Sequence, residues 1–332
     1  MKPRLTIKIE ISIPEADIKH YFNQLTPSAK YRSKTKTIKM ATLTGINTRM
    51  KGSVGDWTFS QVGGQTVVKQ KPAKKQTPVR TFAIMRRRVQ WKNIQNIYSA
   101  FEGRLRPSFE GRAANVSDYN EFISANIDLV PVYLTKTEAR ANAAVVAPYQ
   151  LTRGSLLTVE HTMDVPGKVV TDIGLGDLAV DGDTSVADFS RAVVANSEAY
   201  AFGDQISVFV LHQLVNPDSG IPYVVVKAYE VTLSVEDEST MLSSLVDINY
   251  FKNIDGKLGN GAVFTGGIAY VHSRKTPSGT KVSTQRVVVN SSTLAAYQTR
   301  AALDKAVLSY GGLNEDHFLT PNDPDEVAPV RP

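Results

Sequence analysis

Short segments with alternating apolar and polar residues recur through the second half of this 332-residue chain. The clearest runs from Tyr223 to Ser234, where every second residue builds a richly apolar face and the others build a mixed one. A period of two is typical of a strand with one buried face, and several such segments separated by turns favour an antiparallel sandwich or barrel. We expect strands at Tyr149–Thr158, Val169–Asp172, Gln205–Leu214, Tyr223–Ser234, Gly261–Ser273 and Lys281–Asn290.

The first residues show the same alternation, in Leu5, Ile7, Ile9 and Ile11. A short helix is expected after Pro14, and the segment 31–39 then carries four cations, among them Lys34, Lys36 and Lys39, and no carboxylate. Such a segment cannot bury itself and predicts an exposed linker. The first strand either adds to the sheet edge of a neighbouring molecule or pairs within its own fold.

Glycines punctuate the next segment, residues 40–71. We expect a hairpin between Trp57–Phe59 and Thr66–Lys69, with its turn at Gly63 and Gly64. The glycine pair precedes a strand-like stretch, whereas a phosphate-binding loop opens a helix, so a turn is the favoured interpretation.

A basic helix is expected from Pro78 to about Phe101, with Thr77 as its cap. One stripe of this helix is apolar, while Arg86, Arg87 and Arg88 crowd the other positions. Three successive arginines span roughly 200° of a helix. We therefore expect at least one of them near the buried edge, where it seeks a carboxylate, a carbonyl or an aromatic ring.

Further helices are expected at Ser117–Ile127, Ser185–Ser190 and Ser291–Val307. The predicted fold class is α+β: a basic N-terminal β-arm, a hairpin and helices, followed by a mainly antiparallel β-sandwich-like region. The predicted segments are an arm at 1–39, a Gly-rich hairpin and basic helix at 40–128, a β-rich domain at 129–319 and an acidic, proline-rich tail at 320–332.

Charge is divided unevenly along the chain. Residues 1–113 hold 23 Lys and Arg against 6 Asp and Glu, a net +17, whereas residues 114–332 hold 15 against 26, a net −11. This division favours a polyanion-binding first third, or self-assembly in which the basic part of one copy meets the acidic part of the next. A third interpretation is a single fold in which the charges intermix.

The familiar signatures of catalysis and metal binding are missing from the sequence. The chain has no cysteine, its five histidines are widely spaced, and no nucleophile elbow, phosphate loop or paired-carboxylate motif occurs. The acids between Asp177 and Asp188 do not follow the calcium-loop pattern and predict a turn. We therefore expect that the protein is not an enzyme, that it has no catalytic or metal-binding residue and that it binds no cofactor. No apolar run reaches the ~20 residues of a membrane span.

The segments MKGSVGDWTFSQVGGQTVVKQKP, SDYNEFISANI, YQLTRGSLL and GIAYVHSRKTPSGTKVSTQRVVV stand in an order and spacing that resemble a family of uncharacterised proteins from Bacteroidetes and their phages. Gly52–Gly55, Lys71-Pro72, Tyr119-Asn120 and Arg153-Gly154-Ser155 carry the resemblance, which covers about two thirds of the chain. The occurrence of this family in crAss-like phages implies a virion structural protein, a ring or connector near the portal and tail. Residues 1–39 fall outside the pattern.

We expect a self-assembling virion protein with a homo-oligomeric ring and with portal or tail proteins as partners. Its location would be the virion, and the host cytoplasm during assembly. The candidate contacts are Leu5, Ile7, Ile9, Ile11, Lys34, Lys36, Lys39, Arg86, Arg87 and Arg88. One alternative is a DNA-binding architectural protein that uses the basic first third. The other is a glycan-binding adhesin with an aromatic platform around Tyr223 or Tyr270.

Overall fold

The computed structural model describes residues 40–43, 51–62, 65–71, 81–105, 108–113 and 116–311. Its contacts divide the chain into two compact units, Met1–Lys74 and Lys75–Pro332, called unit 1 and unit 2 below. The predicted arm at 1–39, the cap at Thr77 and the tail at 320–332 lie outside the described residues. The predicted segment 40–128 spans the division between the units.

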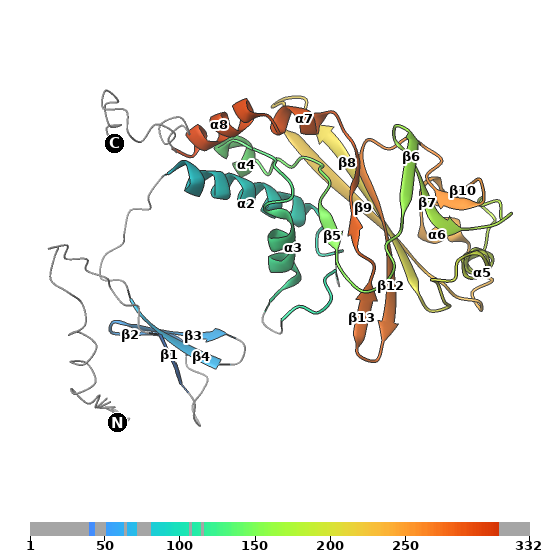
Figure 1. Ribbon diagram of the computed structural model, residues 1–332, viewed down its shortest axis with the longest axis horizontal. Coiled ribbons are helices and arrows are strands. Elements are labelled where there is room, and N and C mark those ends of the chain that lie inside the picture. The colour runs from blue at the N-terminus through green and yellow to red at the C-terminus, as the bar shows by residue number, and fades with distance from the viewer. Residues whose placement is uncertain are drawn as a thin grey trace, which may run out of the picture. The chain divides into compact units, whose positions relative to one another are not determined.

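Unit 1 contains a four-stranded antiparallel sheet (Figure 1). Its strand order is β1 (Met40–Leu43), β4 (Gln65–Gln70), β3 (Trp57–Val62) and β2 (Gly52–Val54). Strands β3 and β4 pair from Trp57 opposite Gln70 to Val62 opposite Gln65. The predicted hairpin is therefore confirmed.

A central antiparallel sheet runs through unit 2. Its strand order is β13 (Gly279–Val282), β12 (Gly266–Thr276), β8 (Gln205–Val215) and β9 (Pro222–Thr232), and β15 (Val288–Asn290) pairs with the other end of β12. Thr276 lies opposite Gly279, so the turn predicted from the sequence Thr-Pro-Ser-Gly is confirmed. Together with the helices, these sheets confirm the α+β fold with a sheet-rich C-terminal region.

A second sheet has the order β10 (Lys252–Ile254), β11 (Lys257–Gly259), β7 (Lys168–Gly174) and β6 (His161–Val165), and β5 (Gln150–Thr152) pairs with β14 (Gln285–Arg286). The sequence patterns missed β6, β10 and β11. Strand β6 is exposed along its whole length, and β10 and β11 have three residues each, so none of them shows a readable alternation.

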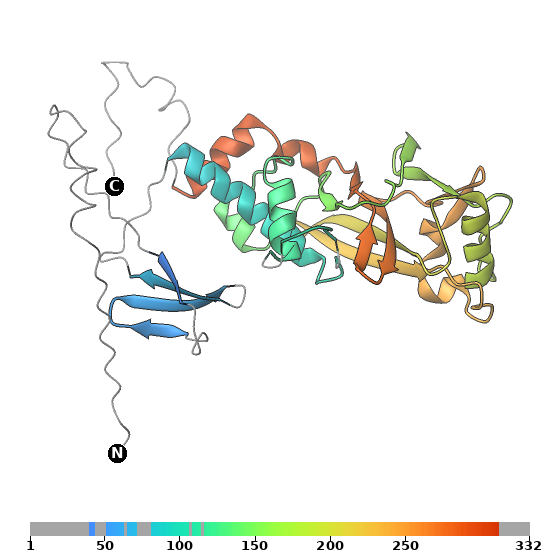
Figure 2. The same cartoon turned by 60° about the horizontal axis from the view of Figure 1, so that its bottom comes forward.

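The helices of unit 2 are α2 (Phe82–Ala100), α3 (Asp118–Asn126), α4 (Lys136–Arg140), α5 (Val186–Asn196), α6 (Leu242–Leu245), the 3₁₀ turn η1 (Ile248–Tyr250), α7 (Thr293–Tyr297) and α8 (Arg300–Ser309). Figures 1 and 2 show α2, α4 and α8 at one end of this unit and α5 and β10 at the other. The predicted helices at Ser117 and Ser185 are confirmed, and each of these serines caps its helix. The region Ser291–Val307 forms two helices instead of one.

Both faces of the central sheet are covered. Along β8, Phe209 and Leu211 join the core beneath the helical end, whereas Val208 and Val210 join the core shared with β7 and α5. Strand β9 serves both cores: Val226 packs on the helical side and Val231 on the other. Alternate side chains of β8 thus pack against the helices on one face of the sheet and against the second sheet and α5 on the other.

The N-terminal end of α2 differs from its prediction. The described helix begins at Phe82, and Thr81 is its cap, because the Thr81 hydroxyl accepts a hydrogen bond from the backbone N–H of Ile84. Thr77 and Thr81 both stand before the apolar stripe, and they are four residues apart. Each could serve as the N-cap as far as the sequence shows.

Candidate functional site: a cationic hollow at the helical end

Helix α2 presents two different surfaces along its length. The predicted apolar stripe is buried: Phe82, Met85 and Val89 pack with Leu303 and Val307 of α8. Further along, Ile94 and Ile97 enter the core under the central sheet. The opposite side carries four cations and no carboxylate. One side of α2 is therefore packed into the core, and its other side is strongly basic.

The predicted arginines Arg86, Arg87 and Arg88 all lie exposed, so the expectation that one would sit at the buried edge is wrong. Met85 and Val89, which flank them, are the fully buried residues of this stretch. Arg87 does pair with Asp128, but both side chains are exposed, so this pair is not the buried-edge contact that was expected.

Helix α4 lies opposite α2, and a capping box formed by Thr135 and Glu138 stabilises its N-terminus. The backbone N–H of Glu138 donates to the Thr135 hydroxyl, and the Glu138 carboxylate accepts from the Thr135 backbone N–H. The hydroxyl of Tyr297 also donates to Glu138, at 3.1 Å. The one carboxylate of α4 is therefore occupied by the cap and Tyr297, while Lys136 and Arg140 remain as its cations.

Specific hydrogen bonds hold these helices together. Buried Asn96 of α2 donates to the carbonyls of Ala139 and Ala143, at 3.1 and 2.8 Å. The Lys136 backbone N–H donates to the Ser309 hydroxyl at the end of α8, at 2.9 Å. With the apolar contact between α2 and α8, these bonds fix all three walls.

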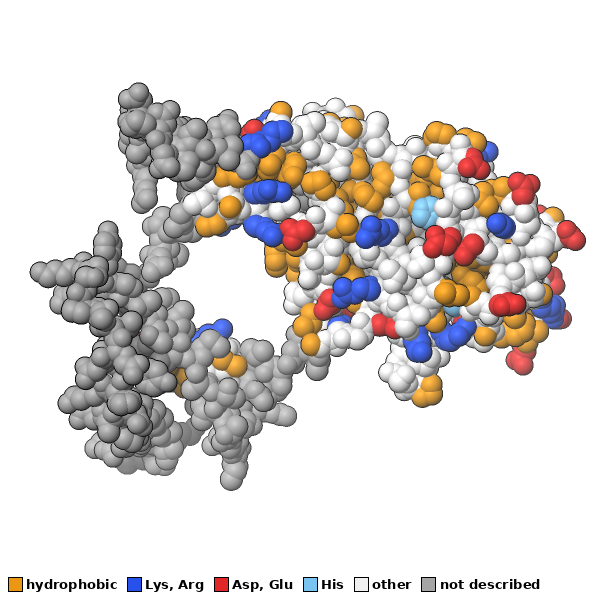
Figure 3. All heavy atoms as spheres, viewed as in Figure 1, with side chains coloured by type: hydrophobic (Ala, Val, Ile, Leu, Met, Phe, Trp, Pro, Cys, Tyr) orange, Lys and Arg blue, Asp and Glu red, His pale blue; other side chains and the backbone are white. Residues whose placement is uncertain are grey.

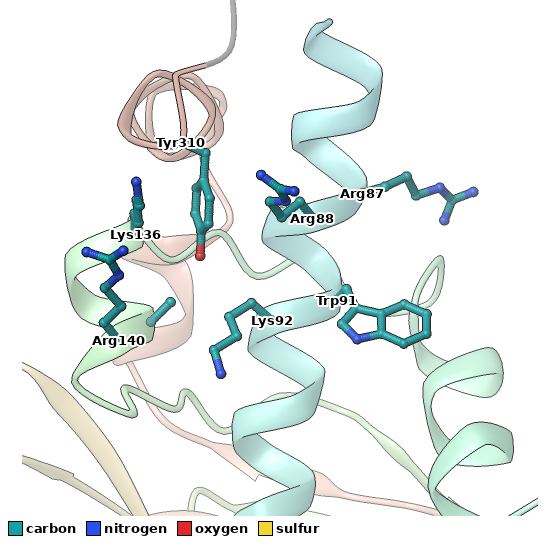
Figure 4. A pocket seen from close by; sticks show the side chains of 8 residues that line it. Arg87, Arg88, Trp91, Lys92, Lys136, Arg140 and Tyr310 are labelled. Carbon is teal, nitrogen blue, oxygen red and sulfur yellow. The ribbon is translucent and has the colours of Figure 1, made fainter. Parts of the chain in front are cut away.

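Between the walls lies a hollow of about 620 Å³. Figure 4 shows Arg88 and Lys92 of α2 facing Lys136 and Arg140 of α4, with the ring of Tyr310 between the two sides. Arg87 and Trp91 point away from α4, toward the outer side of α2. We call these eight residues the cationic hollow: Arg87, Arg88, Trp91, Lys92, Lys136, Ala139, Arg140 and Tyr310.

The positive charge inside the hollow is not neutralised locally. Within the part of the chain that the structure describes, no carboxylate pairs with Arg88, Lys92, Lys136 or Arg140. Burial raises the pKa of Tyr310, and the charges of Arg88 and Arg140 act against that rise. Arg88, Arg140 and Tyr310 line the same hollow, and an anion entering it meets a concentrated positive field.

Trp91, on the outer side of α2 (Figure 4), is 46% exposed, whereas Phe82 at the start of the same helix is buried. A tryptophan ring that keeps nearly half its surface in water leaves a large apolar face free for contact. The two aromatics near these cations thus have different roles: Phe82 is a core residue, and Trp91 is available to a ligand.

Among the predicted contact residues, the hollow includes Arg87 and Arg88 but not Arg86. Leu5, Ile7, Ile9, Ile11, Lys34, Lys36 and Lys39 lie outside the described residues. The sequence patterns missed Lys136, Arg140 and Tyr310. The spacing Thr135-x-x-Glu138 is a capping-box signal that marks the start of α4, but it does not reveal which helix lies opposite.

The predicted aromatic platform of an adhesin is not supported at one of its two positions. Tyr270 is buried and donates its hydroxyl to the carbonyl of Tyr250, at 3.0 Å. Tyr223, on β9, is 38% exposed.

The acidic turn before α5 has the structure expected of it. Asp181 accepts hydrogen bonds from the Asp183 backbone N–H and the Thr184 hydroxyl, at 3.0 and 3.1 Å, and Ser185 caps the helix that follows. Within the described residues, no three His, Asp or Glu side chains come together in a way that could hold a metal ion. The helices of the described part are also too short or too polar to cross a membrane.

No family model matches the chain, and no match was found among curated proteins or solved structures. The resemblance to the phage-protein family stays a prediction.

Proposed function

We propose that the chain is a self-assembling virion structural protein, a ring or connector subunit of a phage head–tail or tail assembly. Copies fold in the host cytoplasm, join one another in the virion and contact portal or tail proteins. The order of the glycine-rich hairpin and the later sheet segments, which resembles the phage family, supports the virion location.

Charge separation between parts of the molecule carries the proposal. Unit 1, Met1–Lys74, holds 14 cations and 4 carboxylates, a net +10. At the end of unit 2 opposite its helices α2, α4 and α8 (Figure 1), residues 160–198 hold eight carboxylates against two cations, and residues 235–257 hold five against two, a combined net of −9. We call these two segments the acidic end. Figure 3 shows carboxylates gathered over the end of unit 2 where Figure 1 draws α5 and β10.

A contact between unit 1 of one copy and the acidic end of the next is heterologous, because two different surfaces meet. Such contacts repeat from copy to copy and close into a ring when the rotation between copies allows. Opposite potentials on the two surfaces guide the copies into register and speed their encounter. The attraction weakens as salt screens it, over a Debye length of ~10 Å at 0.1 M.

Mass photometry of the full chain at micromolar concentration tests the proposal. We expect oligomers at low salt and a shift toward monomer as NaCl rises. Asp183→Lys, in an exposed turn of the acidic end, replaces an attraction by a repulsion and should raise the apparent dissociation constant about fivefold.

Asp218→Lys is the matched control. Asp183 and Asp218 are both exposed turn residues, and each backbone N–H donates to the side chain two positions earlier. Asp218 lies outside the acidic end, so its reversal should leave assembly unchanged. Lys69→Glu, at an exposed position of β4 in unit 1, should weaken assembly, and mixing it with Asp183→Lys should restore it. A strictly monomeric chain at low salt contradicts the proposal.

A further inference from the structure

The cationic hollow has no part in the contact proposed above, which uses unit 1 and the acidic end. We propose that it binds single-stranded nucleic acid: Arg88, Lys92, Lys136 and Arg140 contact the phosphates between the helices, and Trp91, on the outer side of α2 (Figure 4), stacks on a base where the strand passes over that helix.

The arrangement of the cations suits a chain of phosphates. Arg88 and Lys92 stand four residues apart on α2, and Lys136 and Arg140 stand four apart on α4. Four residues of helix advance by about 6 Å, so each wall offers cations on two successive turns. A strand lying between α2 and α4 meets positive charge from both sides (Figure 4).

These cations are also free to bind. In the described part of the chain Arg88, Lys136 and Arg140 have no carboxylate partner, and Lys92 contacts only the neutral Gln95, at 3.2 Å. Glu138, the nearest acid in sequence to Lys136 and Arg140, is occupied by Thr135 and Tyr297. A ligand phosphate therefore does not have to displace an existing ion pair.

The exposed ring of Trp91 distinguishes the ligand class. An acidic peptide would satisfy the cations but gives no reason for an exposed indole on the same helix as Arg88 and Lys92. Nucleic acid supplies both a phosphate and a flat base, and base–aromatic stacking beside a basic groove is the usual means of binding a single strand. In a duplex the faces of the bases are covered by their neighbours, so the stacking surface of Trp91 favours the single strand.

Fluorescence anisotropy with a fluorescein-labelled 15-nucleotide oligo-dT tests the inference on the full chain. Arg88→Gln/Arg140→Gln should weaken binding about tenfold and reduce the salt dependence of log K by about 1.4, since each lost phosphate contact on a single strand removes about 0.7. The matched control is Arg86→Gln/Lys305→Gln. It removes the same charge from exposed positions on α2 and α8 outside the hollow and should change binding less than about twofold.

Trp91 provides a second, independent measurement. The chain has two tryptophans, so Trp57→Phe leaves Trp91 as the sole indole, and its fluorescence should be quenched as oligo-dT is added. Trp91→Ala should weaken binding at least about fivefold. Ile84→Ala, which trims another exposed apolar residue of α2, should not.

The inference is overturned if Arg88→Gln/Arg140→Gln behaves like its control. It is also overturned if polyglutamate of equal charge displaces oligo-dT as well as unlabelled oligo-dT does, or if a 15-base-pair duplex binds more tightly. Circular dichroism and melting curves verify that each variant is folded. Self-assembly and nucleic-acid binding can be tested independently of each other. Arg88→Gln/Arg140→Gln should assemble normally, and Asp183→Lys should bind oligo-dT normally.

Discussion

A buried polar network shows what single residues contribute to this fold. Asp204 accepts two hydrogen bonds from Arg274, both at 2.7 Å, and lies 2.8 Å from Nε2 of His272. His272 is 1% exposed and stacks on Tyr200. Burial opposes ionisation of Asp204, but Arg274 and His272 nevertheless hold its pKa below the ordinary value.

Burial lowers the pKa of His272, against the opposing effect of its hydrogen bond to Asp204. The neutral ring donates through Nε2, and Nδ1 has no partner among the described residues. A proton on Nδ1 would be a buried donor without an acceptor, which explains why the neutral form is favoured. Arg274 already balances the charge of Asp204.

These shifts predict how stability depends on pH. The unfolded chain protonates His272 near the ordinary pKa of 6.5, whereas the folded chain resists, so stability falls as pH drops below about 6.5, by at most ~1.4 kcal/mol per pH unit. The contribution of Asp204 is present above its unfolded pKa and is lost only at lower pH, as pH falls through the folded value.

His272→Gln keeps a donor toward Asp204 but cannot titrate, so it should flatten the dependence between pH 7 and 5 measured by urea unfolding. His212, whose pKa burial also lowers, should supply the remainder. His161→Gln, at an exposed position of β6, is the control and should leave the curve unchanged. An unchanged slope in His272→Gln contradicts the assignment.

At the scale of elements, α2 is the support on which the cationic hollow is built. Ile97 is fully buried and contacts the core under the central sheet, whereas Ile84 on the same helix is 48% exposed. Ile97→Ala should lower the free energy of unfolding by about 3 kcal/mol, through lost burial and the cavity left behind.

The control is Ile84→Ala, which removes the same atoms from an exposed position and should change the free energy of unfolding by less than about 0.5 kcal/mol. Urea denaturation of both variants measures the difference. Equal effects of the two substitutions would show that α2 does not pack as described.

At the scale of the whole molecule, unit 2 holds both of its large apolar cores within its own residues. A segment with its own core folds without the rest of the chain. Residues 75–332 expressed alone should therefore give a cooperative melt within about 3 °C of the main transition of the full chain. Differential scanning calorimetry checks this, and a broad, non-cooperative melt would show that unit 2 needs unit 1.

Much of the fold could be predicted because its signals are local. Alternation placed β8 and β9 within two residues, Ser117 and Ser185 marked two helix starts, and Thr276–Gly279 marked a turn. The arginines of α2 also identified the first wall of the hollow. Helix α4 was missed because five residues are too few to show a helical period.

The sequence by itself determined where charge is concentrated, which segments alternate and which residues cap or turn, because each depends on neighbours along the chain. Only the tertiary structure decided that Lys136, Arg140 and Tyr310 face Arg88 and Lys92, and that His272 meets Asp204. These residues are separated by tens to hundreds of positions. The apolar cores and the strand register bring them together, and neither can be read from local spacing.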